Sequence, residues 1–215
     1  MELNGTIVTT WIVMALLVTL GIALTRRMSI TAPDTGQTIA EIVVATMRSA
    51  IAQVVPRECD LVFPFVATLW MFLVTANIIG IVPGLSSPTA DLSTTSALAV
   101  LTYFFVHWTG IRSVGLRRYL AHYVSPNPIM LPFEVITEIS RTVTLAVRLF
   151  GNMMSLEMAA VIIVGLAGFL VPIPILMLHV VEALIQAYIF GMLALVYVAS
   201  AVEIQQQRLA KGAVS

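Results

Sequence analysis

A few polar or ionisable side chains interrupt the apolar runs in the last third of the chain. The central ones are Arg148, Asn152, Glu157, His179, Glu182 and Gln186. Arginine keeps its charge at any physiological pH, so it can attract a carboxylate or repel a cation but cannot relay a proton by releasing one. Glutamate and histidine can exchange protons near neutral pH when their surroundings favour it. This set predicts an ion path that is lined by carboxylates and interrupted by a permanent positive charge.

Helical spacing sorts the first three of these side chains onto two faces. At about 100° per residue, Asn152 shares the face of Arg148, because it follows four residues later. Glu157 follows nine residues after Arg148 and lies about 180° away. The arginine and this glutamate therefore cannot neutralise each other within one helix. From physics alone, Arg148 is either a functional charge or a structural side chain that snorkels or pairs with an acidic group of the same chain.

The last apolar segment carries a polar stripe of its own. His179, Glu182 and Gln186 fall at positions i, i+3 and i+7, so they share one helical face. A single buried histidine is often only a hydrogen-bonded packing residue. A carboxylate one turn away makes a role in ion transfer an equal alternative.

Three further charges lie toward the beginning of the same long apolar region. Glu134 and Glu138 are one turn apart, and Arg141 follows. The two glutamates either serve an ion path or are simply solvated at the membrane boundary. Arg141 either belongs to that path or sets the depth of the helix.

The composition of the chain indicates an all-α integral membrane protein. Of 215 residues, 59% are hydrophobic and 10% are charged, whereas soluble domains carry about 25% charged residues. A net charge of zero predicts no attraction to nucleic acid. Cys59 is the only cysteine, which excludes an internal disulfide and most metal cages. With no GxGxxG, P-loop, HExxH or GxSxG motif, the chain is not expected to be an enzyme by itself or to hold a cofactor or metal.

Crossing a bilayer takes about 20 apolar residues in a helix. A single membrane domain over residues 1–215 with five spans is expected, at residues 7–25, 61–82, 92–111, 129–170 and 173–201. The prolines at 172 and 174 separate the last two into an antiparallel hairpin, because proline lacks the amide that a continuing helix needs. Its first arm is longer than one crossing, so it must tilt, bend or protrude, or else break near Gly151.

Residues 38–55 differ from the spans, because Glu41, Arg48 and Gln53 interrupt the apolar pattern. This pattern indicates an amphipathic helix in the membrane interface, with half-buried packing on neighbouring helices as the alternative. At the first span, two arginines follow the apolar run and none precedes it, which favours a retained helix over a cleaved signal peptide.

The basic residues predict the orientation of the chain. They follow the first, third and last spans and precede the second, at Arg26, Arg27, Arg48, Arg57, Arg112, Arg117, Arg118, Arg208 and Lys211. All of these fall on one side if the N-terminus is outside and the C-terminus is in the cytoplasm.

Several segments together resemble subunit a of F-type ATP synthases over nearly the whole chain. They are FVATLWMFLVTANIIGIVPG, PTADLSTT, LAVRLFGNMMS and HVVEALIQAYIFGMLALVYVA. The stretch MLPFEVITEISRTVTLAVRLFGN and the short N-terminus resemble the alternative branch of these enzymes, which is often sodium-linked. The few residues before the first span depart from the usual pattern and put an N-terminal contact with the peripheral stalk in doubt.

The resemblance implies a stator in a bacterial cytoplasmic membrane, with a ring of c subunits and the b subunits of the peripheral stalk as partners. The arginine of that family matches Arg148 and faces the carboxylates of the ring. Further matches fall on Asn152, Glu157, His179 and Gln186. Two offset half-channels would meet the ring on either side of the arginine, while the role of Glu182 follows from spacing alone.

The resemblance therefore predicts an outer path through Glu157, His179 and Glu182, with Asn77 and Asp91 as weaker candidates. The inner path would pass near Glu134 and Glu138. The transported ion is a proton or sodium, since the selective site belongs to the ring. Two alternatives are a secondary ion transporter, which would often show inverted repeats that are not evident here, and a structural membrane scaffold, in which a neutral residue could replace Arg148.

Overall fold

The structure, a computed structural model, describes residues 5–26, 35–80, 87–116, 119, 131–167 and 173–212. The described part is a set of helices inclined to one another. In chain order they are α1 (Gly5–Arg26), α2 (Thr35–Val54), α3 (Cys59–Ile79), the 3-10 turn η1 (Pro88–Ala90), α4 (Leu92–Val114), α6 (Leu131–Ala167) and α7 (Ile173–Gly212). Some of the predicted features lie outside the described residues. They are the proline turn at residues 171–172, the ends of two spans at residues 81–82, 129–130 and 168–170, and Arg27, Arg117 and Arg118.

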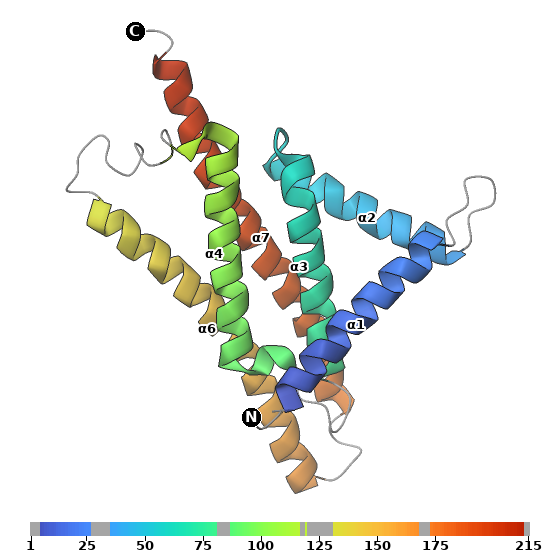
Figure 1. Cartoon of the computed structure of the whole chain (residues 1–215). Helices are drawn as coiled ribbons and strands as arrows, with labels where there is room; N and C mark the ends of the chain where they lie inside the picture. Colours follow the sequence, from blue (N-terminus) through green and yellow to red (C-terminus); the bar gives the residue numbers. More distant parts are fainter. Residues whose placement is uncertain are drawn as a thin grey trace.

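Helix α7 is the centre of the packing. It lies against α3 and α4, while α6 packs mainly on α4 and more sparsely on α7 (Figure 1). α1 crosses α3 at a slant, and α2 extends sideways from the N-terminal end of α3 (Figure 1). This arrangement leaves one long side of α6 and of α7 without a partner helix in the described part of the chain.

The lengths of α6 and α7 exceed one bilayer crossing. α6 has 37 residues and runs without interruption through Gly151, which gives a length of about 55 Å. α7 has 40 residues and a length of about 60 Å. Helices this long must incline to the membrane normal or protrude from it, and α6 and α7 are both oblique to α4 (Figure 1).

Four of the described helices are long and apolar enough to cross a membrane. Their apolar parts are Gly5–Arg26, Cys59–Ile79, Pro132–Ile163 and Met177–Ser200. α4 does not meet the same criterion, and its sequence contains many serine and threonine residues besides His107 and Arg112. The all-α membrane architecture is therefore confirmed, whereas the number of five spans stays a prediction.

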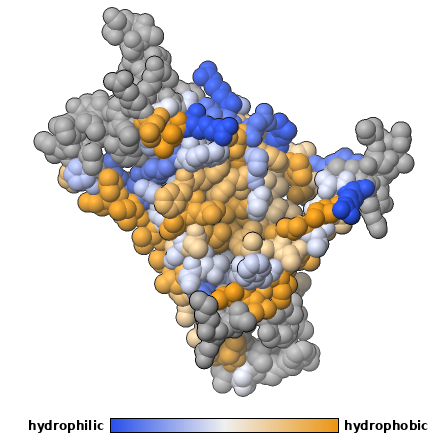
Figure 2. All heavy atoms as spheres, viewed as in Figure 1, coloured by the Kyte–Doolittle hydropathy of each residue, from blue (hydrophilic) through white to orange (hydrophobic). Residues whose placement is uncertain are grey.

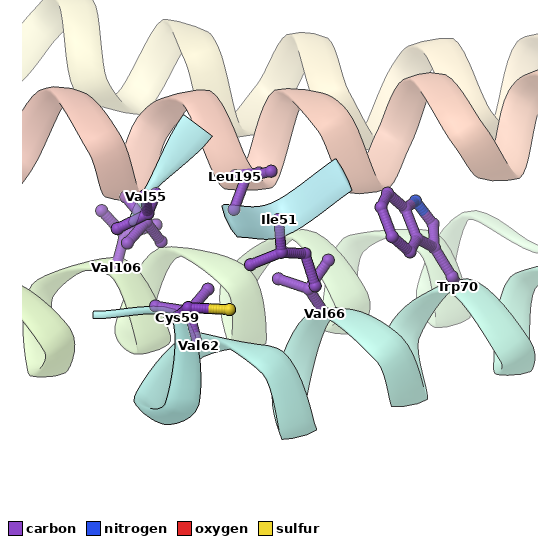
Figure 3. Packing of buried hydrophobic residues seen from close by; sticks show 9 residues of the cluster. Ile51, Val55, Cys59, Val62, Val66, Trp70, Val106 and Leu195 are labelled. Atoms are coloured by element: carbon purple, nitrogen blue, oxygen red, sulfur yellow. The ribbon is translucent and has the colours of Figure 1, made fainter. Parts of the chain in front are cut away.

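The first hydrophobic core joins the end of α2 to α3, α4 and α7. Its buried members are Ile51, Val55, Cys59, Val62, Val66, Trp70, Val106, Leu195 and Val198 (Figure 3). At the same end, the Arg48 guanidinium donates to the Asp60 carboxylate at 2.5 Å. The first half of α2 leaves Ile39, Ile42 and Val44 exposed, which suits a helix whose apolar side meets lipid.

The second hydrophobic core holds the long helices in register. It brings together Leu69, Leu73, Ala99, Leu145, Ala146, Leu149, Ala187, Phe190 and Ala194 from α3, α4, α6 and α7. Small residues let the backbones approach closely in a membrane, where apolar burial supplies little driving force between helices. Gly191 shows how close they are, because a Cβ there would overlap the Trp70 indole.

The ends of α4 have recognisable caps. The Asp91 carboxylate accepts a hydrogen bond from the Ser93 amide at 2.8 Å, as an N-cap residue does. Gly115 ends the helix with φ of 91°, in the left-handed region that favours glycine, and its amide donates to the Ile111 carbonyl at 2.7 Å.

Apolar residues cover most of the surface. Figure 2 shows them over the middle of the visible face, with hydrophilic residues gathered mainly toward the end where α3 begins and α4 ends. Even large side chains such as Trp11, Phe104 and Val161 are at least 65% exposed. An apolar surface of this extent is expected where lipid or another membrane subunit replaces water.

Candidate ion-translocation site

Arg148 lies on the outer side of α6. Its neighbours Leu145, Ala146 and Leu149 are buried in the second core, whereas Arg148 and Val147 are exposed. Because the buried residues fix the rotation of α6, the guanidinium must face away from the bundle. Among the described residues, no acidic group forms an ion pair with Arg148. The charge therefore points toward whatever covers this side of the molecule.

Asn152, one turn after Arg148, connects α6 to α7. Its Nδ2 donates to Gln186 Oε1 at 2.8 Å. Gln186 is 2% exposed, and its own Nε2 has no hydrogen-bond partner among the described residues. The structure thus joins two of the candidate residues directly and leaves a buried amide donor beside them.

Asn77 is the centre of a second polar cluster, where α3, η1 and α7 meet. It is fully buried, and both ends of its amide are paired: Nδ2 donates to the Ala183 carbonyl at 3.3 Å, and Oδ1 accepts from Thr89 Oγ1 at 2.6 Å. Ser87 Oγ lies 2.7 Å from Thr89 Oγ1 and donates to the Ala76 carbonyl at 3.1 Å. A buried amide without partners would be costly, so this network fastens η1 to α3 and α7.

Ser87 and Thr89 are functional candidates that sequence reasoning missed. Their signal was weak, because hydroxyl residues are ordinary in a loop next to a span. Their importance comes from their buried hydrogen bonds to Ala76 and Asn77 of α3.

His179 lies beside this network. It is 3% exposed, its ring is against the backbone of Asn77, and its Nε2 has no hydrogen-bond partner in the part of the chain that the structure describes. Glu182 is half-buried one turn along α7 and close enough to act on the histidine electrostatically. The predicted pair of histidine and carboxylate is therefore present on one side of α7.

Glu157 lies elsewhere, in an open pocket of about 460 Å³. The pocket is lined by Thr6, Ser87, Ala90, Asp91, Leu92, Phe150, Met154 and Glu157. Asp91 is thus the carboxylate that shares a pocket with Glu157. Ser87 belongs both to this pocket and to the cluster of Asn77, so it connects the two. Thr6 of α1 was not anticipated, since nothing in the sequence places α1 beside α6.

The inner candidates occupy the first half of α6. Glu138 Oε1 lies 3.3 Å from His107 Nε2 of α4. The Arg141 guanidinium lies over the Tyr197 ring of α7, 5.5 Å from its centroid. Glu134 is half-buried and has an interaction of its own. His107 was missed, although a histidine in a largely apolar helix is a signal worth noting. Within the described residues, no group of His, Cys, Asp and Glu could hold a metal ion.

The chain is similar to proteins that are named as subunits of ATP synthases. The chain matches the family described as ATP synthase A chain over residues 7–199. A Legionella pneumophila protein named ATP synthase subunit a is 53% identical over 203 residues, which cover 94% of this chain and 88% of the relative. A Pelobacter propionicus protein named ATP synthase subunit a 2 is 58% identical over 97% of this chain and 91% of its own length.

A third relative, from Hahella chejuensis, is named ATP synthase subunit a 1 and is 55% identical over 94% of this chain and 86% of its own length. The match spans nearly all of the described helices, including those that carry Arg148, Asn152 and Gln186. The chain therefore belongs to the ATP synthase A chain family.

Proposed function

We propose that this chain is the ion-translocating stator of the membrane sector of a rotary ATP synthase, and that it performs no chemical catalysis itself. Family membership supports the role. The observation that carries the mechanism is Arg148, a permanent charge on the open side of a helix whose other side is firmly packed. The comparisons give no support to a secondary transporter or to a purely structural scaffold.

The partner of Arg148 is a ring of c subunits whose carboxylates carry the ion. Around the arginine, α6 exposes Val143 and Val147, and α7 exposes Leu184 and Ile185. An apolar surface with one fixed cation suits a ring that is apolar outside and carries a carboxylate at mid-membrane depth. Arg148 attracts each carboxylate after it has lost its ion, and repels a cation that would otherwise pass directly between the two paths.

The outer path begins at the pocket shared by Asp91 and Glu157. Hydroxyl groups of Ser87 and Thr89 continue it to the buried amide of Asn77. These groups are spaced within hydrogen-bonding distance, so they supply a polar route through an apolar bundle.

From Asn77 the path turns along α7. It passes His179 and Glu182 and reaches Gln186 and its partner Asn152, which stands one turn from Arg148. Within the described residues, His179 Nε2 and Gln186 Nε2 have no hydrogen-bond partner, which supports this route, because buried polar atoms without partners usually indicate a polar ligand or water.

The inner path lies near the start of α6, at Glu134 and Glu138, with Arg141 beside them. An ion that boards the ring from one path leaves by the other after almost a full turn. One charge that crosses 100 mV supplies about 2.3 kcal/mol, so several ions are needed for each ATP. The pattern of basic residues supports an N-terminus outside and a C-terminus in the cytoplasm of a bacterial inner membrane. The b subunits of the peripheral stalk would hold the stator against rotation.

Vesicles that contain the assembled complex test this function. ATP-driven uptake is measured while sodium and proton concentrations are varied independently, and the c-ring is sought by co-purification. The proposal expects a co-purified ring and uptake of one of the two ions. An assembled complex that hydrolyses ATP yet moves neither ion would overturn it. Uptake that depends on the sodium concentration would support the sodium-linked branch. Uptake that does not depend on sodium would identify the proton as the transported ion.

A further inference from the structure

The two long helices α6 and α7 run antiparallel, and two contacts fix their register. Asn152 Nδ2 donates to Gln186 Oε1 at 2.8 Å. The Arg141 guanidinium lies over the Tyr197 ring, 5.5 Å from its centroid. The contact residues are eleven positions apart on α6, and they are also eleven positions apart on α7, in the opposite direction. Each step of one residue toward the outer end of α6 is therefore matched by one step back along α7.

This register brings Ser155 of α6 level with Glu182 of α7. Ser155 follows Asn152 by three residues. Glu182 precedes Gln186 by four residues. Both therefore lie about one turn, or about 5 Å, from the hydrogen bond between the two amides, and on its outer side. That hydrogen bond holds the two helices within reach of each other's side chains at this depth.

Both side chains lie on the open side of the bundle. Ser155 follows Arg148 by seven residues, or two turns, so it shares the outward face of the arginine, and it is exposed. On α7, the residues one turn before and one turn after the half-buried Glu182 are Leu178 and Ile185, which are 57% and 52% exposed. A hydroxyl and a carboxylate therefore stand at one level on adjacent helices, toward the side on which the ring is proposed to lie.

The Ser155 hydroxyl differs from two other hydroxyls of α6. Thr142 Oγ1 donates to the Glu138 carbonyl at 3.0 Å. Thr144 Oγ1 donates to the Ser140 carbonyl at 2.7 Å. Such bonds to the preceding turn are common for hydroxyl residues inside a helix. Ser155 Oγ makes no hydrogen bond to any of the described residues, so its lone pairs can serve a ligand.

Two buried atoms without partners lie on either side of Glu182 along α7. His179 Nε2 belongs to the preceding turn and Gln186 Nε2 to the following one, and neither has a hydrogen-bond partner among the described residues. The two side chains are 3% and 2% exposed. Buried polar atoms of this kind usually indicate water or a polar ligand. A polar ligand is therefore expected beside Glu182.

We propose that Ser155 and Glu182 form a binding site for the transported cation at the end of the outer path, where the ion is held next to the ring. The inference rests on the proposed function, because it adds a site to the outer path of that function. A carboxylate and a hydroxyl oxygen can accept hydrogen bonds from a hydronium ion or coordinate sodium. The carboxylate also offsets the cost of a positive charge in a medium of low dielectric constant.

The position of Arg148 makes this a site of the outer path alone. Ser155 lies two turns from Arg148, which is about 10 Å along α6. A cation at Ser155 and Glu182 that moved inward would approach the permanent charge of the arginine, and one that moved outward would not. The bound ion can therefore pass to a carboxylate of the ring or return to the outer side.

Inside-out vesicles of the whole complex test the site, because their lumen corresponds to the outer side. ATP-driven uptake is measured while the lumenal concentrations of sodium and of protons are varied independently at a fixed membrane potential. Ions in the lumen occupy the site and oppose release, so each complex has a lumenal concentration that halves the rate. The ion for which a variant changes this concentration is the one that the site binds.

Ser155→Ala should raise the half-inhibiting concentration by about threefold to tenfold, which corresponds to the loss of one hydrogen bond. The rate at low lumenal concentration should stay unchanged, since the ion then leaves without competition. Ser155→Thr keeps a hydroxyl and should restore the original value. Glu182→Gln should raise the half-inhibiting concentration as well. The double variant should exceed Glu182→Gln little, because the hydroxyl alone binds a cation weakly.

Thr144→Ala is the matched control. It removes a hydroxyl from the same face of α6, but this hydroxyl is bonded to its own helix, and the register puts Ala194 rather than a carboxylate opposite it. The control should keep the half-inhibiting concentration of the unmodified complex. Co-purification of the ring confirms that each variant is assembled.

An assembled Ser155→Ala complex with an unchanged half-inhibiting concentration for both ions would overturn the proposal. Additive effects of Ser155→Ala and Glu182→Gln, or a Ser155→Thr variant that behaves like Ser155→Ala, would overturn it too. Arg148→Ala separates this inference from the proposed function. That variant should stop coupled uptake, and uptake that survives in it would contradict the function itself, whatever Ser155→Ala does.

Discussion

At the scale of single residues, the main finding is that hydrogen bonds to other segments hold the buried amides of Asn77 and Gln186 in place. Asn77 is the clearest case, because its amide accepts a hydrogen bond from Thr89 of η1 and donates one to the Ala183 carbonyl of α7. The low dielectric constant of the protein interior strengthens such hydrogen bonds, and it also makes a buried polar group without a partner costly. The cluster should therefore matter for stability as well as for conduction.

Asn77→Ala should lower the stability of the assembled complex by about 1–3 kcal/mol, because it removes the buried hydrogen bonds of Asn77 to the Ala183 carbonyl and to the Thr89 hydroxyl. Thermal unfolding in detergent measures the change. Thr75→Ala on the same helix is the control, since that hydroxyl bonds only the Met71 carbonyl of its own helix in the described part of the chain. Equal unfolding temperatures for the two variants would show that the cluster contributes nothing.

Glu182→Gln tests a residue whose role rests on its position beside His179. If Glu182 conducts, the variant should slow ATP-driven uptake while ATP hydrolysis by the detached catalytic sector is unchanged. Uptake rates are compared across pH, because a neutral amide cannot exchange a proton. Rates equal to those of the unmodified complex at every pH would make Glu182 a packing residue.

At the scale of elements, close packing of α7 on α3 sets the distances within the site. Gly191 allows this approach, since any side chain there would meet the Trp70 indole. The bond between Asn152 and Gln186 depends on the same register, because α7 carries Gln186 less than two turns before Gly191.

Gly191→Ala should destabilise the bundle by about 1–3 kcal/mol through overpacking. Trp70→Leu, which removes the indole, should recover most of that loss in the double variant. Unfolding temperatures of the two single variants and the double variant measure the coupling. Gly165→Ala is the control, as a Cβ there meets nothing within 4 Å. A neutral Gly191→Ala would contradict the close contact.

Sequence patterns predict the elements better than the contacts between them. Apolar length and proline positions indicated the long helices, and one-turn spacing put Asn152 beside Arg148. The contacts of Ser87 and Thr89 with α3, and of His107 with α6, were not predictable, because they arise from how the chain folds back and from how its helices cross. Local periodicity carries no information about that crossing. The sequence predicted an outer path through Glu157, His179 and Glu182 with Asp91 as a weaker candidate, and in the structure Glu157 and Asp91 line one pocket.

At the scale of the whole molecule, packing divides the bundle into a fixed side and an open side. The two cores hold α3, α4, α6 and α7 together, and Arg148 emerges on the side that they leave free. A stator needs this asymmetry, since one side must stay rigid while a partner moves past the other.

The proposed orientation of the two termini across the membrane can be tested at the same scale. Single cysteines introduced near Gly5 and near Gly212 should react with a membrane-impermeant reagent from opposite sides of the membrane, the first from outside and the second from the cytoplasm. The native Cys59 is buried and should contribute little background. Labelling of both positions from one side would contradict the proposed topology.

The most direct measurement of the central claim is ATP-driven ion uptake by vesicles with Arg148→Ala in an otherwise complete complex. The account predicts no coupled uptake, together with a passive leak of the transported ion between the two paths. Thr144→Ala, one turn earlier on the exposed side of α6, should assemble with the ring and keep coupled uptake. Coupled uptake that survives in Arg148→Ala would contradict the account.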